Sequence, residues 1–201
     1  MRMTILDRIL LLMTGLLAAY QIAVGIDGVS NPPLMAYTIA FGVLLVAGLL
    51  LIVLGFDVLD SPLVVIVSTV IPLSLSLGLV WEHFATYRTP YLIFVIVGFL
   101  AVLTTRLLPQ RQSLPVLVLA VVHGIAGLTI VLLPILLSIT GQARPGFSLV
   151  GVGGALIGVG GLLLALLKAG KPLLSRGTIL KILPGLLLLM TAAFVAGFAL
   201  E

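Results

Sequence analysis

The chain has 201 residues, of which 62% are hydrophobic and only 8% are charged. Soluble domains carry about a quarter charged residues, so this composition excludes a water-soluble globule and favours a protein embedded in a bilayer. The net charge of +4 comes from residues scattered singly, which argues against nucleic acid as a partner, and the absence of cysteine excludes disulfides and thiol chemistry.

Long apolar runs follow one another along the whole chain. A helix needs about 20 mainly apolar residues to cross the hydrocarbon of a membrane. The sequence has seven runs of about this length, at residues 9–26, 34–56, 63–81, 91–108, 114–139, 147–167 and 179–200. It therefore predicts an all-α integral membrane protein, in which residues 1–201 form one bundle of seven transmembrane helices in contact with membrane lipids.

The first run follows Arg2 and Arg8, as in the start of a secretory signal. It is long for such a signal and has no clear small-x-small cleavage site. We expect it to remain as the first helix.

Two kinds of polar group stand out in the first five runs. The first lies at the end of the third run, where Glu82 and His83 could act as acid and base and Arg88 could hold an anion. Aromatic residues surround them, so a plainer interpretation is a solvated segment at the membrane interface. The segment is a candidate outer site.

The second group lies inside the runs. His123 falls nine residues into the fifth run, where an imidazole must find a polar partner. Ser68 and Thr69 lie at similar depth in the third run, and Gln21 could extend a polar pocket with them. The alternative is a hydrogen bond that only joins two helices.

The sixth run carries a row of glycines. Gly151, Gly154, Gly158 and Gly161 follow at steps of three, four and three, so they share one face of a helix, and Gly153 and Gly160 widen it. Such a face lets another helix approach closely. It predicts a dimer seam, a groove for a lipid or cofactor tail, or tight packing inside the bundle.

Lysine and arginine are unevenly divided between the two sides of the predicted bundle. Two lie on one side, Arg88 and Arg144; eight lie on the N-terminal side, namely Arg2, Arg8, Arg106, Arg111, Lys168, Lys171, Arg176 and Lys181. Because positive charge marks the cytoplasmic side, we expect the N-terminus in the cytoplasm, the C-terminus outside, and the bundle in the plasma (inner) membrane.

A shift of 112 residues places the first three runs on the last three with the same direction. It aligns Gly15 with Gly127, Pro33 with Pro145, and Pro72 with Pro184. This favours a weak 3+1+3 parallel repeat, as in some transporters, although two leucine-rich halves could also share it by composition.

No convergent reactive set is evident, so the first functional hypothesis is a non-enzymatic subunit or scaffold of a membrane assembly or of a homo-oligomer. The alternative is a small transporter or channel for an uncharged or weakly polar solute, with its path between the two halves. A membrane enzyme or redox subunit using Glu82 and His83 ranks third. We expect no cofactor and no metal, because His83 and His123 lie at different depths, separated by at least about 15 Å.

Overall fold

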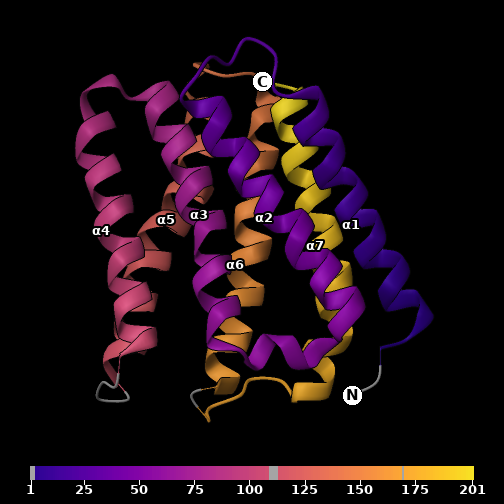
Figure 1. The fold of residues 1–201 in the computed structure, drawn as a ribbon. Coiled ribbons are helices and arrows are strands. Elements are labelled where there is room, and N and C mark those ends of the chain that lie inside the picture. Colours follow the sequence, from indigo (N-terminus) through magenta and orange to yellow (C-terminus); the bar gives the residue numbers. More distant parts are fainter. Residues whose placement is uncertain (1–2, 109–112, 169) are drawn as a thin grey trace.

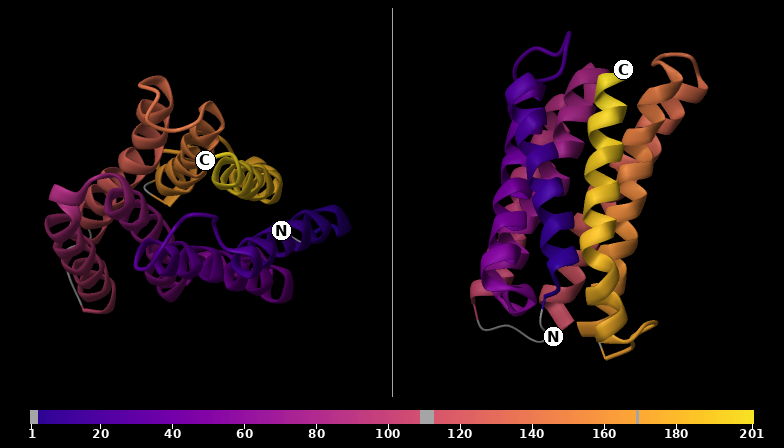
Figure 2. Two further views of the ribbon diagram at one scale, coloured as in Figure 1. Left: turned by 90° about the horizontal axis from the view of Figure 1, so that it is seen from above. Right: turned by 90° about the vertical axis from the view of Figure 1, so that its right-hand side faces the viewer.

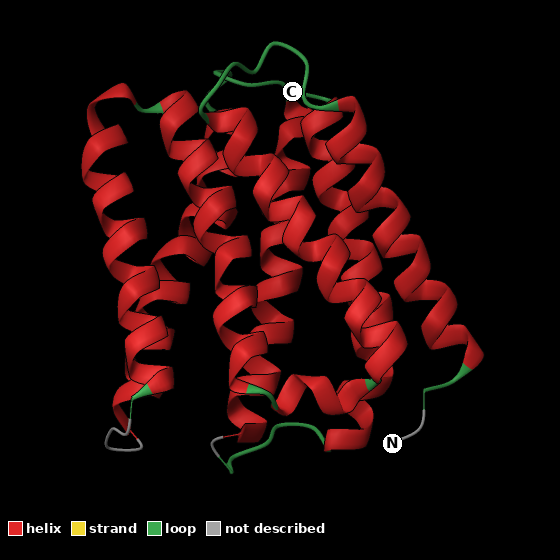
Figure 3. Cartoon of the chain, in the orientation of Figure 1, coloured by secondary structure: helices red, strands yellow, loops and turns green. Residues whose placement is uncertain are grey.

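The computed structural model describes residues 3–108, 113–168 and 170–201. Within these residues there are helices and loops but no strand (Figures 1 and 3). The seven long helices are α1 (Ile5–Val24), α2 (Pro33–Leu54), α3 (Pro62–His83), α4 (Arg88–Leu107), α5 (Ser113–Ile139), α6 (Ser148–Lys168) and α7 (Arg176–Ala199). Three short 3-10 helices join them: η1 (Phe56–Asp60), η2 (Ala85–Tyr87) and η3 (Pro145–Phe147).

The predicted all-helical bundle with seven membrane-length helices is confirmed. Each of the seven is long and apolar enough to cross a membrane. Arg2 and Arg111, which contribute to the predicted charge asymmetry, lie outside the described residues. The N-terminus and the C-terminus lie at opposite ends of the bundle (Figure 1), and we name these ends the N-terminal end and the C-terminal end.

The largest difference from the predicted bounds is at α1, which begins at Ile5 rather than four residues later. Thr4 and Asp7 form a capping box, in which the Thr4 side chain accepts from the Asp7 N–H and the Asp7 carboxylate accepts from the Thr4 N–H. These bonds satisfy amide groups that the first helical turn leaves without partners. The helix therefore begins before the apolar run does.

The helices form two layers of three with α4 at one edge (Figure 2). In the first layer α2 packs between α1 and α3, and in the second layer α6 packs between α5 and α7. The layers meet where α1 contacts α7 and where α3 contacts α5, and α4 packs outside on α3 and α5.

A shift of 112 residues relates these contacts to one another. It turns the pairs α1–α2 and α2–α3 into α5–α6 and α6–α7, and exchanging the two sets of three helices turns α1–α7 into α5–α3; all of these pairs are observed. It also relates Pro33, the first residue of α2, to Pro145, the first residue of η3, and Pro72 inside α3 to Pro184 inside α7.

Aromatic side chains fill the space between the layers near the C-terminal end. The ring centroids of Tyr37 and Phe198 are 4.7 Å apart, and Phe41 makes edge contacts with Phe194 and Phe198. On the outside, large apolar side chains such as Ile5 and Val53 are 80% and 77% exposed. Such a surface suits contact with lipid rather than with water.

Candidate functional site

Part of the α6 glycine row lies in the seam between α5 and α6. A Cβ atom on Gly151 would lie 2.6 Å from the carbonyl oxygen of Val131 and 2.7 Å from Cγ1 of Ile135. A Cβ atom on Gly154 would lie 2.7 Å from Cγ2 of Ile130. Side chains at these positions would therefore prevent the approach of the two helices, as at small-residue seams of other membrane helices.

The two flanking glycines of α6 face α7 instead. A Cβ atom on Gly153 would lie 2.7 Å from Cδ1 of Phe194, and one on Gly160 would lie 2.9 Å from Cδ2 of Leu186. Glycine thus allows α6 to pack closely against both of its neighbours in the second layer.

The rest of the glycine row is open. Gly158 and Gly161 are exposed, and a Cβ atom on either would meet no atom within 4 Å. On α5, Gly124 and Gly127 are equally open, and their spacing from Val131 places them on the face that α5 turns toward α6. The seam is therefore closed near the C-terminal end and open toward the N-terminal end; we call these four glycines the open seam.

A group of polar side chains gathers at the C-terminal end. The Tyr37 hydroxyl donates to Oε2 of Glu82 at 3.0 Å, and Nε2 of His83 lies 3.3 Å from Oε1 of Glu201. One ligand atom from each of Glu82, His83 and Glu201 lies within 4.8 Å of the others. We call Glu82, His83, Glu201 and Tyr37 the terminal cluster.

The fold brings these four residues from three helices. Tyr37 lies in the first turns of α2, Glu82 and His83 end α3, and Glu201 follows α7. The segment before α6 packs closely against this cluster. The His83 ring lies 5.4 Å from the ring of Phe147, and a Cβ atom on Gly146 would overlap Leu200. The side chains of His83 and Glu201 are consequently only 16% and 20% exposed.

Arg88, the third residue of the predicted outer site, is directed elsewhere. Its Nε donates to the carbonyl oxygen of Trp81 at 2.6 Å, and its guanidinium carbon lies 5.9 Å from the centre of the Trp81 ring. It therefore fastens the connection between α3 and α4. Among the described residues it forms no hydrogen bond or ion pair with Glu82 or His83.

The residues of the predicted inner pocket are not joined by hydrogen bonds. Ser68 and Thr69 both donate to the carbonyl oxygen of Val65, in their own helix, and Gln21 donates to that of Gly25, at the opposite end of the bundle. Nδ1 of His123 is buried and has no hydrogen-bond partner among the described residues. No hydrogen bond among the described residues joins Ser68, Thr69 or Gln21 to His123, and the inner pocket stays a prediction.

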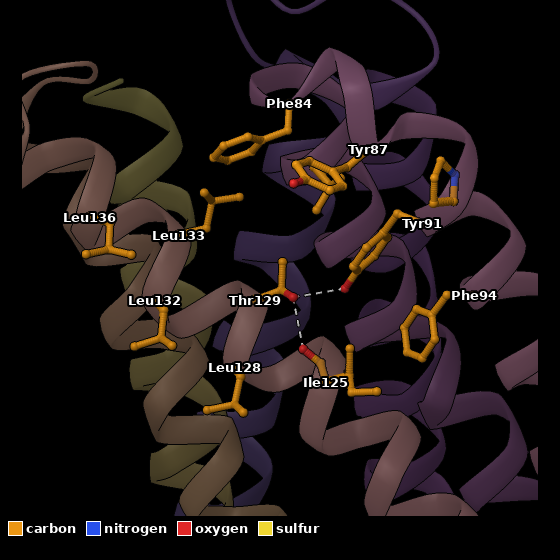
Figure 4. A pocket seen from close by; sticks show the side chains of 12 residues that line it. Phe84, Tyr87, Tyr91, Phe94, Ile125, Leu128, Thr129, Leu132, Leu133 and Leu136 are labelled. Carbon is orange, nitrogen blue, oxygen red and sulfur yellow. Dashed lines mark hydrogen bonds between the residues drawn. The ribbon is translucent and has the colours of Figure 1, made fainter.

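An apolar groove that the sequence analysis does not predict lies between α3, α4 and α5 (Figure 4). Its volume is about 600 Å³, and aromatic rings from Phe84, Tyr87, Tyr91 and Phe94 line one side of it. The Tyr91 hydroxyl donates to Oγ1 of Thr129 at 3.1 Å, so this polar group is satisfied within the wall. A groove of this composition on a lipid-facing surface suits a hydrocarbon chain.

Comparison with known proteins gives no relative. No protein-family model matches the sequence, and no curated protein and no solved structure matches it.

Proposed function

We propose that the chain is a non-enzymatic, multi-pass membrane protein that acts as a subunit or scaffold of a membrane assembly. In this proposal the open seam receives a transmembrane helix of a partner subunit. The observation that carries it is the set of four glycines, on two adjacent helices, at each of which an added Cβ atom would meet no other part of the bundle within 4 Å.

The physics of helix association in lipid supports this role. Lipid tails are as apolar as leucine, so helices in a membrane associate through close packing and not through the hydrophobic effect. A face without side chains allows two backbones to approach and to gain many dispersion contacts. The same glycine row already forms such a seam at Gly151 and Gly154 within this chain.

Replacing Gly158 or Gly161 by leucine should release the partner. The leucine side chain would occupy the space that the incoming backbone needs, while its Cβ atom would meet no atom of its own bundle within 4 Å. Purification from native membranes in mild detergent, followed by size measurement, should give a complex for the wild type and a species of one chain, 21.0 kDa plus detergent, for the variants.

Gly42 provides the matched control. It lies in α2, on a different layer, and a Cβ atom there would also meet nothing within 4 Å. Gly42→Leu should therefore leave the complex intact. An unchanged complex in the Gly158 and Gly161 variants would refute the role of the open seam, and a complex of identical chains would identify the partner as a second copy.

We further propose that the N-terminal end faces the cytoplasm of a plasma (inner) membrane. Eight of the ten lysines and arginines of the sequence belong to that side, which supports this orientation. The chain has no cysteine, so single substitutions can be labelled without background. An impermeant thiol reagent should label Arg144→Cys in intact cells and Lys171→Cys only after permeabilisation; the reverse pattern would overturn the orientation.

The repeat is part of the same proposal. The corresponding contacts of the two layers, and the corresponding prolines at the start of α2 and of η3, support a duplicated three-helix unit joined by α4. In a parallel repeat of this kind each layer would have the same direction through the membrane.

A further inference from the structure

The ligand atoms of the terminal cluster lie close to the spacing that a metal site requires. A tetrahedral ion with bonds of about 2.0–2.1 Å holds its ligand atoms about 3.3–3.4 Å apart. The imidazole nitrogen of His83 and Oε1 of Glu201 are already 3.3 Å apart, and the third ligand atom, from Glu82, lies within 4.8 Å of both. A three-ligand set requires the Glu82 oxygen to approach the other two ligand atoms more closely.

Two atoms of this cluster lack the partners that burial demands. Nε2 of His83 and Oε2 of Glu201 are both buried from solvent and form no hydrogen bond among the described residues, and the contact of Nε2 with Oε1 of Glu201 is an ion pair only where His83 is protonated. A buried polar atom without a partner costs roughly 1–3 kcal/mol. A cation held by Nε2 and by both carboxylate oxygens of Glu201 would satisfy both atoms.

The charge balance points the same way. Glu82 and Glu201 are two carboxylates in a half-buried position, and they repel each other where the surroundings screen them poorly. Arg88, the nearest cation in the sequence, is bonded to Trp81 instead. The remaining cation at this end, Arg144, lines an adjacent hollow that Glu201 also borders.

From this geometry we propose that Glu82, His83 and Glu201 bind one divalent transition-metal ion of the zinc class, which fastens the end of α3 to the segment after α7. An imidazole with two carboxylates is a ligand set that such ions accept, and water would complete the coordination. The metal would lock the two layers together at the C-terminal end.

Tyr37 is the supporting residue of this site. Its hydroxyl donates to Oε2 of Glu82 and so restrains that carboxylate beside the other two ligands. Loss of such an outer partner commonly weakens metal binding by about 10–100-fold. The hollow of about 530 Å³ that Glu201 and Arg144 line provides a route for the ion from outside the bundle.

The test is a titration of the full chain, purified in detergent and treated with a chelator, with Co²⁺ as the probe. One Co²⁺ per chain should bind, with visible absorption that Zn²⁺ abolishes by displacement. His83→Gln and Glu201→Gln should lose this stoichiometric binding. Binding that is absent in the wild type, or equal in these variants, would overturn the proposal.

Two further variants separate a loss of metal binding from a loss of folding. Tyr37→Phe keeps all three ligands and should weaken Co²⁺ binding by about 10-fold or more, whereas an unchanged affinity would contradict the site. Asp27→Asn removes an exposed carboxylate from the loop between α1 and α2, at the same end of the bundle, and should bind Co²⁺ as the wild type does. Thermal unfolding of each purified variant establishes that it is folded.

Discussion

Replacing Gly151 by leucine should separate α5 from α6 and strongly destabilise the bundle. The new Cβ atom would lie 2.6 Å from a carbonyl oxygen of the neighbouring helix, and backbone cannot rotate away as a side chain can. Overpacking of this kind costs about 1–3 kcal/mol, and more where the backbone must move. Thermal unfolding of the purified chain in detergent would measure the loss.

The same substitution at Gly158 is the internal control. Gly151 and Gly158 belong to one face of one helix, but a Cβ atom on Gly158 would meet no atom of the chain. Gly158→Leu should therefore unfold at the wild-type temperature, or above it, because leucine favours helix over glycine. Equal stability of the two variants would mean that α5 and α6 do not make the closed seam described above.

The positions of the helices along the sequence are largely predictable, because each span needs about 20 apolar residues. The residues at which the helices begin and end are less predictable, because hydropathy detects contact with lipid and not the hydrogen bonds at a helix terminus. At α7 the helix starts three residues before the predicted run, at Arg176, where the Ser175 side chain accepts from the N–H of Thr178. Caps of this kind extend helices into the polar flanks.

The division of the glycine row illustrates what sequence periodicity omits. Spacing alone gives Gly151 and Gly158 the same environment, since both lie on one face. The structure separates them because α5 and α6 approach at one end and not at the other. The direction of a neighbouring helix is a tertiary property, so the sequence predicts a glycine face but not which part of it is open.

The terminal cluster is predictable in part. Glu82 and His83 are adjacent in the sequence, so their proximity does not depend on how the helices pack. The alternating direction of the spans could also have placed Glu201 and Tyr37 at the same end. That α2, α3 and α7 are neighbours there depends on the pairing of the layers, which local sequence does not encode.

The inner pocket shows the opposite case. Matching depth suggests Ser68 and Thr69 as partners of His123, whereas the hydrogen bonds that the structure gives these hydroxyls go to Val65 in their own helix. Ser and Thr in membrane helices can satisfy themselves on the preceding turn, so similar depth does not imply contact.

Replacing Gly78 by alanine should destabilise the bundle, although alanine in place of a helical glycine usually stabilises a helix by about 0.8–1.0 kcal/mol. A Cβ atom on Gly78 would overlap the Tyr37 ring, with Cζ at 2.7 Å and Cδ1 at 2.8 Å. Tyr37 is 1% exposed and its ring packs on that of Phe198, so it cannot move aside. We expect a net loss of about 1–3 kcal/mol from this overpacking.

Two comparisons make this prediction specific to the contact between α2 and α3. Gly42→Ala, at an open position of α2, should be neutral or stabilising, because the added methyl group meets nothing. Tyr37→Leu should restore part of the stability of Gly78→Ala, since a smaller side chain leaves room for the methyl group, and the double-mutant cycle would measure their coupling. Additive effects of the two substitutions would show that the Tyr37 ring does not occupy the space beside Gly78, and the restraint of Glu82 by Tyr37 would then lose its support.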